Sequence, residues 1–202
     1  MTSEDSLSIE ERAQFFAPNW NAPLDPVRYL LTIPATATIS GMFLLGMVNE
    51  AQERGLKLAS AAPRYLPFNF YPVRDHVQLM FDYSQAMFPS LPLRQGVRKI
   101  GHGASHALLS STIGRVMLAT ATDPVSSLAA FASSYAVNLR PGSAEVVRHG
   151  ANWAIVALRD VHYLLDSNHI GTWEGVLKLV GMRGEVLYRS LGPAAADFLI
   201  TW

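Results

Sequence analysis

The hydrophobic pattern of this chain changes from a helical to an alternating period at Pro141-Gly142. After that dipeptide, apolar residues alternate along residues 145–148 and 153–161, with a turn composition between them near residues 150–152. Strict alternation is typical of a β-strand, because successive side chains point to opposite faces of a sheet. In the second segment both alternating sets are apolar, which indicates a strand buried on both faces. The pattern therefore predicts two strands joined by a turn.

The residues that follow predict one more helix and two more strands. Four apolar residues share the spacing i, i+3, i+4 and i+7 of one helix face: Trp173, Val176, Leu177 and Val180. Gly181 or Gly184 ends this helix. Residues 186–189 and 198–202 alternate again. We therefore expect an α+β domain, with N-terminal helices packed on a mainly antiparallel C-terminal sheet in the order strand-strand-helix-strand-strand.

The segment before Pro141 has helical rather than alternating spacing. Helices are expected over residues 40–54, 75–88, 91–121 and 124–138, the third being one helix or two. Ser40 and Asp123 are suitable N-caps for the first and the last of these helices. Residues 61–72 contain three prolines, which exclude a helix, so we expect a loop or a short extended piece there.

Residues 1–25 are expected to form a flexible lead, and residues 26–202 a single domain. Phe15, Phe16 and Trp20 are unusual in such a lead. They indicate a segment that either packs back onto the domain or docks on a partner. The lead has no basic region followed by an apolar one, so no secretory signal is expected.

The charge balance bears on the class of partner. Sixteen basic and sixteen acidic residues give a formal net charge of +0, whereas nucleic-acid-binding domains carry a basic face, so no nucleic acid is expected. Charged residues make up only 16% of the chain, against about 25% in ordinary domains. This scarcity favours a homodimer or another protein partner that covers one face. The apolar segment 41–48 is far shorter than the roughly 20 residues that cross a bilayer, so we expect no transmembrane segment and a cytoplasmic protein.

Candidate metal ligands are few. The chain has no cysteine, which excludes disulfides, thiolate ligands and cysteine nucleophiles. His102 and His106 are spaced i, i+4 in an expected helix, which places two imidazoles on one face for zinc, iron or haem. The H-E-x-x-H pattern is absent, and two polar residues beside a glycine-rich packing site explain the pair more simply. No metal site is predicted.

A second polar cluster precedes the C-terminal helix: Asp160, His162, Asp166 and His169. Asp166 or Ser167 is well placed to cap that helix. The spacing specifies no third metal ligand and no nucleophile, so no catalytic residue is predicted. Glu174 lies on the same helix between Gly171 and Gly175, where another backbone can approach closely.

The longest stretch with little charge covers residues 104–139. Apart from His106, its only charged residues are Arg115 and Asp123. Such a run lines a ligand channel, forms a dimer interface or belongs to an ordinary core, and the sequence leaves all three open.

Three elements carry a resemblance to a known family: Tyr71-Pro72, the segment "FPSLPLR" and the helix that begins "GTWEG". Together they resemble a family of unknown function, about 200 residues long, largely confined to myxobacteria and present in many paralogues. The resemblance covers residues 37–202.

More distantly, the C-terminal third resembles the four-vinyl-reductase domain and the TRAPP transport-particle subunits. These share a G-x-x-E-G type helix followed by two strands, here Gly171 to Gly175 and the strands after Gly184. The resemblance implies an α/β sandwich, often dimeric, in which helices enclose an apolar channel for small hydrophobic molecules. The cysteines of those families are missing here, so their thiol and metal chemistry does not carry over. Haem-nitric-oxide-binding domains have a related outline, but their proximal histidine and Y-x-S-x-R signature are absent.

Three functions compete. The first is a non-catalytic regulatory or sensory domain that binds a small apolar ligand between helices or acts through dimerisation. Its expected ligand contacts are His102, His106, Arg115, Trp173 and Glu174. The second is a protein-interaction or assembly subunit without a ligand, and the third is an enzyme or a haem or metal protein that uses the histidine clusters. The resemblance favours the first; haem or another apolar ligand is compatible with it, although no motif specifies one.

Overall fold

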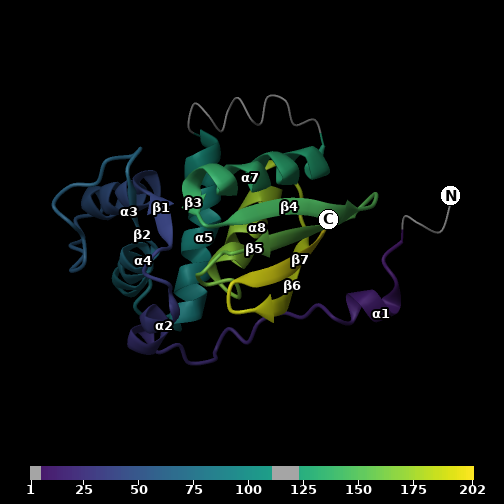
Figure 1. The fold of residues 1–202 in the computed structure, drawn as a ribbon, viewed down its shortest axis with the longest axis horizontal. Helices are drawn as coiled ribbons and strands as arrows, with labels where there is room; N and C mark the ends of the chain where they lie inside the picture. The colour runs from purple at the N-terminus through teal and green to yellow at the C-terminus, as the bar shows by residue number, and fades with distance from the viewer. Residues whose placement is uncertain (1–5, 111–122) are drawn as a thin grey trace.

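The computed structural model describes residues 6–110 and 123–202, without the side chains of residues 105–110. Its elements follow in the order α1 (Ile9–Arg12), α2 (Pro26–Thr32), β1 (Thr38–Ser40), α3 (Gly41–Glu53), β2 (Phe70–Pro72), α4 (Val73–Met87), α5 (Leu93–Ser110), α7 (Pro124–Asn138), β3 (Leu139–Arg140), β4 (Ser143–His149), β5 (Trp153–Arg159), α8 (Asn168–Leu179), β6 (Glu185–Gly192) and β7 (Ala195–Thr201). Helices α2, α3 and α4 gather at one end of the molecule, the four-stranded sheet forms the other, and α5 runs between them (Figure 1).

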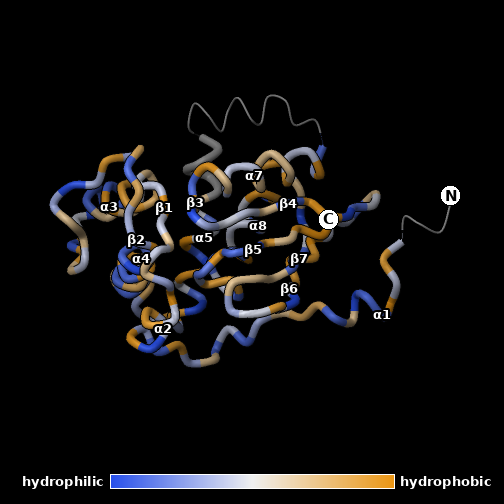
Figure 2. Tube along the Cα trace, viewed as in Figure 1, coloured by the Kyte–Doolittle hydropathy of each residue, from blue (hydrophilic) through white to orange (hydrophobic). Residues whose placement is uncertain are grey.

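The C-terminal sheet confirms the predicted fold class. Its strands pair antiparallel in the order β4-β5-β7-β6, with α8 between β5 and β6 in the chain. Every residue of β5 except its last is buried, as the two apolar faces predict, and Figure 2 shows this apolar run within the sheet. The inner face presents Val156, Leu158 and Phe198 to the helices, where burial of apolar side chains is the main stabilising contribution.

Helices α5 and α8 cross at very short range, because glycines stand at the crossing. A Cβ atom added to Gly101 would lie 2.0 Å from the Asn168 carbonyl oxygen, and one added to Gly171 would lie 1.9 Å from that of Arg98. No side chain fits at either position. The "GTWEG" helix is therefore held against α5 by backbone contact, and Trp173 on its inner face is fully buried in the main core.

A second sheet of three short strands, in the order β2-β1-β3, was not expected from the sequence. Ile39 of β1 pairs with Tyr71 on one side and Leu139 on the other. Strands of two or three residues are too short to display an alternating period, so the pattern could not reveal them. The hydroxyl of Ser40 does not cap α3; it donates to the Pro67 carbonyl oxygen at 2.8 Å and holds the incoming loop.

The first described residues run along the outside of the C-terminal sheet (Figure 1). Phe15 is buried against Trp153, Ile155 and Leu199 on the outer face of that sheet, and Phe16 pairs with Tyr188 at its β6 edge. The segment therefore packs on its own domain in this structure. A division of the chain at residue 25 stays a prediction.

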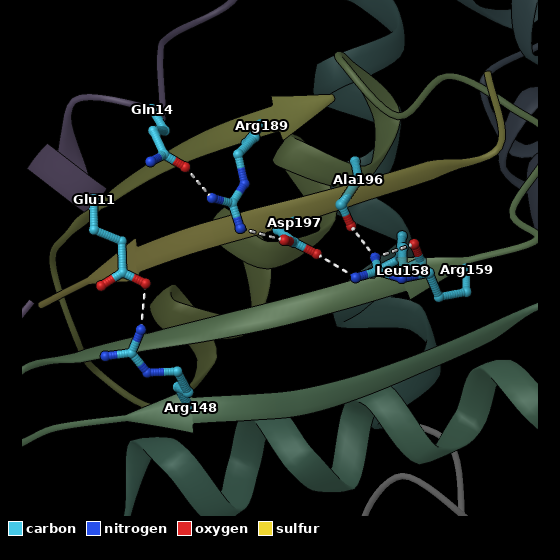
Figure 3. Close-up of polar contacts among 8 residues, drawn as sticks. All are labelled: Glu11, Gln14, Arg148, Leu158, Arg159, Arg189, Ala196 and Asp197. Carbon is cyan, nitrogen blue, oxygen red and sulfur yellow. Dashed lines mark hydrogen bonds and ion pairs between the residues drawn. The ribbon is translucent and has the colours of Figure 1, made fainter. Parts of the chain in front are cut away.

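Polar contacts accompany this packing (Figure 3). The carboxylate of Asp197 accepts from Arg159 and from Arg189, each at 2.7 Å, and Arg189 also donates to Gln14 of the N-terminal segment. Arg148 donates to Glu11 of the same segment. None of the helices that the structure describes is long and apolar enough to cross a membrane.

Candidate functional site

A small cavity of about 60 Å³ lies where the N-terminal helices meet α7 and α8. Its lining comes from five helices, β3 and the loop before α8: Phe43, Met47, His76, Met80, Ile100, Ala104, Phe131, Ser134, Tyr135, Asn138, Leu139, Tyr163, Asn168, His169 and Thr172. None of these side chains carries a formal charge while its histidines are neutral. We name this space the inner cavity.

His76 lies in the first turn of α4, on the face that is buried in the core. The side chain is 5% exposed, and burial lowers the pKa of His76 from 6.5 to about 3. Its Nδ1 atom has no hydrogen-bond partner in the described part of the chain. His76 is therefore a neutral imidazole at every physiological pH, with one ring nitrogen unsatisfied.

His169 occupies the first turn of α8 and is 1% exposed. Burial lowers the pKa of His169 to about 3, and the nearby backbone of Tyr163 opposes this effect only in part. Its Nδ1 atom lies 2.8 Å from the hydroxyl of Tyr135 on α7, whereas Nε2 has no hydrogen-bond partner among the described residues. A second neutral imidazole with one unsatisfied ring nitrogen therefore lines the inner cavity.

Two tyrosines connect these histidines. The Tyr163 ring lies 5.5 Å from the His76 ring and 4.7 Å from the His169 ring, centroid to centroid. Burial raises the pKa of Tyr163 and of Tyr135 well above the usual value of 10, so both stay protonated phenols. The cavity therefore combines an apolar wall with hydrogen-bonding groups that are all neutral.

The loop that carries Tyr163 has an unusual backbone. Asp160 and Leu164 adopt positive φ angles of 56° and 46°, a region that bulky side chains such as leucine rarely enter. Leu164 is held there from both sides: its N–H donates to the Tyr29 hydroxyl, and its carbonyl accepts from the Ser167 N–H at 3.1 Å. Backbone strain of this kind collects at functional sites. Here it fixes Tyr163 and the first turn of α8 against the cavity.

Three of the five sequence-predicted ligand contacts, His102, Trp173 and Glu174, have described side chains, and none of these three lines the inner cavity. Glu174 is paired with Arg98, whose Nε atom lies 2.8 Å from its carboxylate. Trp173 stacks on Tyr135 at 5.9 Å, one layer behind the cavity wall. His102 is half-buried on α5 and does not line the cavity; burial, followed by the charge of Lys178, lowers its pKa.

The remaining two candidates are not described in the structure. The backbone of His106 belongs to α5, but its side chain lies outside the described residues, and Arg115 lies outside them entirely. The five residues as a ligand-binding set stay a prediction.

Sequence reasoning missed His76 and gave His169 only as a member of a polar cluster. The available signal for His76 was a lone histidine on the apolar face that contains Val73, Val77 and Met80. Of the other cluster members, Asp166 pairs with Arg94, and Asp160 is exposed. Among the described residues, no group of three or more histidine, aspartate or glutamate side chains could hold a metal ion.

Comparison with solved structures defines the class of fold. The chain matches the unliganded Fe(II) H-NOX protein from K. algicida at a TM-score of 0.61 and 13% identity, covering 81% of this chain and 96% of that one. It matches the H-NOX protein from S. oneidensis in the Fe(II)NO state at 0.56 and 12% identity, covering 80% and 98%. The fold is therefore shared with H-NOX proteins. This corrects the distant resemblance to four-vinyl-reductase and TRAPP proteins, since the structural neighbours are H-NOX domains.

The sequence itself gives the family. The family model described as "Protein of unknown function (DUF2378)" matches residues 33–202, so the chain belongs to that family. This confirms the predicted membership in a family of unknown function. No curated protein sequence matches the chain.

The two H-NOX structures are in Fe(II) states, and a third solved structure that the chain matches concerns heme. Sites for cofactors and other small molecules are usually about 300–1,000 Å³, several times the 60 Å³ available here. The space between α7 and α8 is filled by rings, with Phe131 and Tyr135 lying 5.4 Å and 5.9 Å from Trp173. The described residues do not fit haem.

Proposed function

We propose that this chain is a non-catalytic sensory domain that binds one small neutral molecule in the inner cavity. The observation that carries the proposal is the pair of buried imidazoles, His76 and His169. Both line the inner cavity, and each has one ring nitrogen without a hydrogen-bond partner among the described residues. An unsatisfied buried polar group costs about 1–3 kcal/mol, and a bound water or other small molecule is one way to satisfy it.

The lining restricts the chemistry of the ligand. A charged molecule would lose its hydration without gaining an ion pair from the described lining, because none of the described side chains at the cavity is charged. A purely apolar molecule would leave both imidazole nitrogens unsatisfied. The ligand that fits has a few non-hydrogen atoms, no charge and at least one atom that donates or accepts a hydrogen bond. Ordered water alone is the competing occupant, since the cavity has room for it.

The position of the cavity supports a sensory role. It lies between the N-terminal helices and the C-terminal half, so a bound molecule contacts α4 and α8 at once. A bound molecule would favour one arrangement of the N-terminal helices relative to the C-terminal half. A ligand changes the population of a conformational state in this way. Transmission of this change to a protein partner, association as a homodimer and a cytoplasmic location are further parts of the proposal. The H-NOX likeness supports it through the fold alone.

Native mass spectrometry of the freshly purified protein, compared with its denatured mass, tests the proposal. We expect a reproducible excess mass that is lost on denaturation and that is strongly reduced in His169→Phe, because this substitution removes both ring nitrogens. The matched control is His149→Phe, which changes an exposed histidine away from the cavity and should keep the excess mass. The same spectra report whether one chain or two are present.

A wild-type protein that shows only the mass of its chains would contradict ligand binding and favour ordered water. An excess mass retained in His169→Phe would place the bound molecule elsewhere and would equally contradict this site.

A further inference from the structure

A second hollow lies beside the inner cavity and opens to solvent between α3, α4 and α5. Its volume is about 340 Å³, within the range of about 300–1,000 Å³ typical of small-molecule sites. Phe43, Met47 and Ile100 belong to the lining of both spaces, so they form the wall between them. We name this space the outer groove.

Two glycines on facing helices line the outer groove, Gly46 on α3 and Gly103 on α5. A Cβ atom added to either residue would have no described atom within 4 Å. This distinguishes them from Gly101 and Gly171, where an added Cβ would overlap a neighbouring backbone. Glycine inside a helix destabilises it relative to alanine, and packing explains that cost at Gly101 but not at Gly46 or Gly103. Both of these unexplained glycines widen the same groove.

Among the described residues, the groove has an apolar floor and one cationic group at its rim. Met42 and Leu45 line it together with the shared wall. Lys99 also lines it, with its ammonium 5.7 Å from the Phe88 ring centroid, and no described carboxylate lies within ion-pair distance of Lys99. The carboxylate of Glu50, which also lines the groove, is already paired with Arg54 at 3.0 Å.

We propose that the outer groove binds a small amphipathic carboxylate, with its apolar body over Gly46 and Gly103 and its carboxylate at Lys99. The apolar floor favours a hydrocarbon body, because removing it from water is favourable. One unpaired ammonium matches one negative charge, and Glu50 on the same rim disfavours a second. The open glycines leave the helix backbones accessible, so the body of the ligand can lie directly against them.

Decanoate is the probe for this site, and 1-octanol is the uncharged comparison; binding of both is measured by isothermal titration calorimetry. We expect decanoate to bind the wild-type protein and Gly46→Leu to abolish this binding. The leucine side chain would occupy the groove, and the open space around Gly46 lets the variant fold, which its circular dichroism melting curve checks. Gly46→Ala is the matched control and should retain most of the affinity, because one methyl group fills little of the groove.

The charge is tested separately. Lys99→Gln should weaken decanoate binding about fivefold, which corresponds to the upper end of the free energies found for solvent-exposed ion pairs. The same substitution should leave 1-octanol binding unchanged. Lys57→Gln, an exposed lysine in the loop after α3, is the control and should bind both probes as the wild type does. Because His169→Phe alters only the inner cavity, it should bind decanoate normally.

The absence of decanoate binding, or equal binding by a folded Gly46→Leu variant, would overturn the outer-groove site. Equal weakening of decanoate and 1-octanol by Lys99→Gln would overturn the assignment of the carboxylate to Lys99. Loss of decanoate binding in His169→Phe would place the probe in the inner cavity instead. Native mass spectrometry detects a molecule that is already bound in the inner cavity, whereas calorimetry measures the binding of added decanoate to the outer groove. Either proposal can therefore fail while the other holds.

Discussion

Acidification from pH 7 to pH 4.5 should lower the free energy of unfolding by about 5 kcal/mol through His76 and His169 alone. In the unfolded chain each imidazole binds a proton as the pH falls below 6.5, whereas in the folded chain burial lowers the pKa of each to about 3. The unfolded state therefore binds more protons throughout this interval, and stability decreases as pH falls. The contributions of neutral His76 and neutral His169 to the free energy of unfolding are fully present above pH 6.5 and are lost progressively toward pH 3.

Urea unfolding at a series of pH values measures this effect. Below pH 6.5 each histidine should contribute a slope of up to about 1.4 kcal/mol per pH unit, and the range from pH 5 to 6.5 keeps most carboxylates ionised. His76→Phe should remove about half of the histidine contribution to the slope, and the exposed His149→Phe should leave the slope as in the wild type. Identical slopes for wild type and His76→Phe would show that His76 is protonated in the folded protein, and the neutral-cavity interpretation would then be wrong.

The long elements of the fold could be predicted because their patterns are local. The alternation around Trp153 and the i, i+3, i+4, i+7 spacing from Trp173 each span several residues of one segment, and both correspond to observed elements. The expected cap at Asp123 is also confirmed, with a Ser126 N–H donating to its carboxylate at 2.9 Å. Helix α2 was not expected, although Asp25 before Pro26 is a suitable start for a helix.

The candidate site could not be predicted, because its residues come from separate segments and look ordinary in each. His76 follows from no motif, and Tyr135 lies in a helix of small and apolar residues where an aromatic side chain normally indicates core. What makes these residues distinctive is the absence of hydrogen-bond partners for two imidazole nitrogens, which only the packed structure defines. Glu174 shows the opposite case: its prominent sequence position is explained by the ion pair with Arg98 that joins α5 to α8.

The second large effect is expected at Asp197, on the outer face of β7. Its carboxylate is 7% exposed and is the shared acceptor of Arg159 and Arg189, whose side chains are 44% and 28% exposed (Figure 3). Asp197→Ala would leave two guanidinium groups close together without their counter-charge. We expect the free energy of unfolding to fall by about 3 kcal/mol. This is the lower end of the losses found when one partner of a buried ion pair is removed, because both arginines reach solvent.

Urea unfolding of three variants separates the contributions of charge and burial. Asp197→Asn keeps the size and one oxygen acceptor, so its loss should lie between wild type and Asp197→Ala. Glu11→Gln is the matched control: it removes an ion pair with Arg148 that joins the N-terminal segment to the same sheet, but Arg148 is 47% exposed, and the loss should stay below about 1 kcal/mol. Equal small losses for Asp197→Ala and Glu11→Gln would contradict the argument, because Asp197 would then behave as a surface charge. If only the Asp197 variants lose several kcal/mol of unfolding free energy, the stability of the outer face of the sheet depends on this one buried carboxylate. The N-terminal segment covers that face, and Arg189 contacts both Asp197 and Gln14 of the segment.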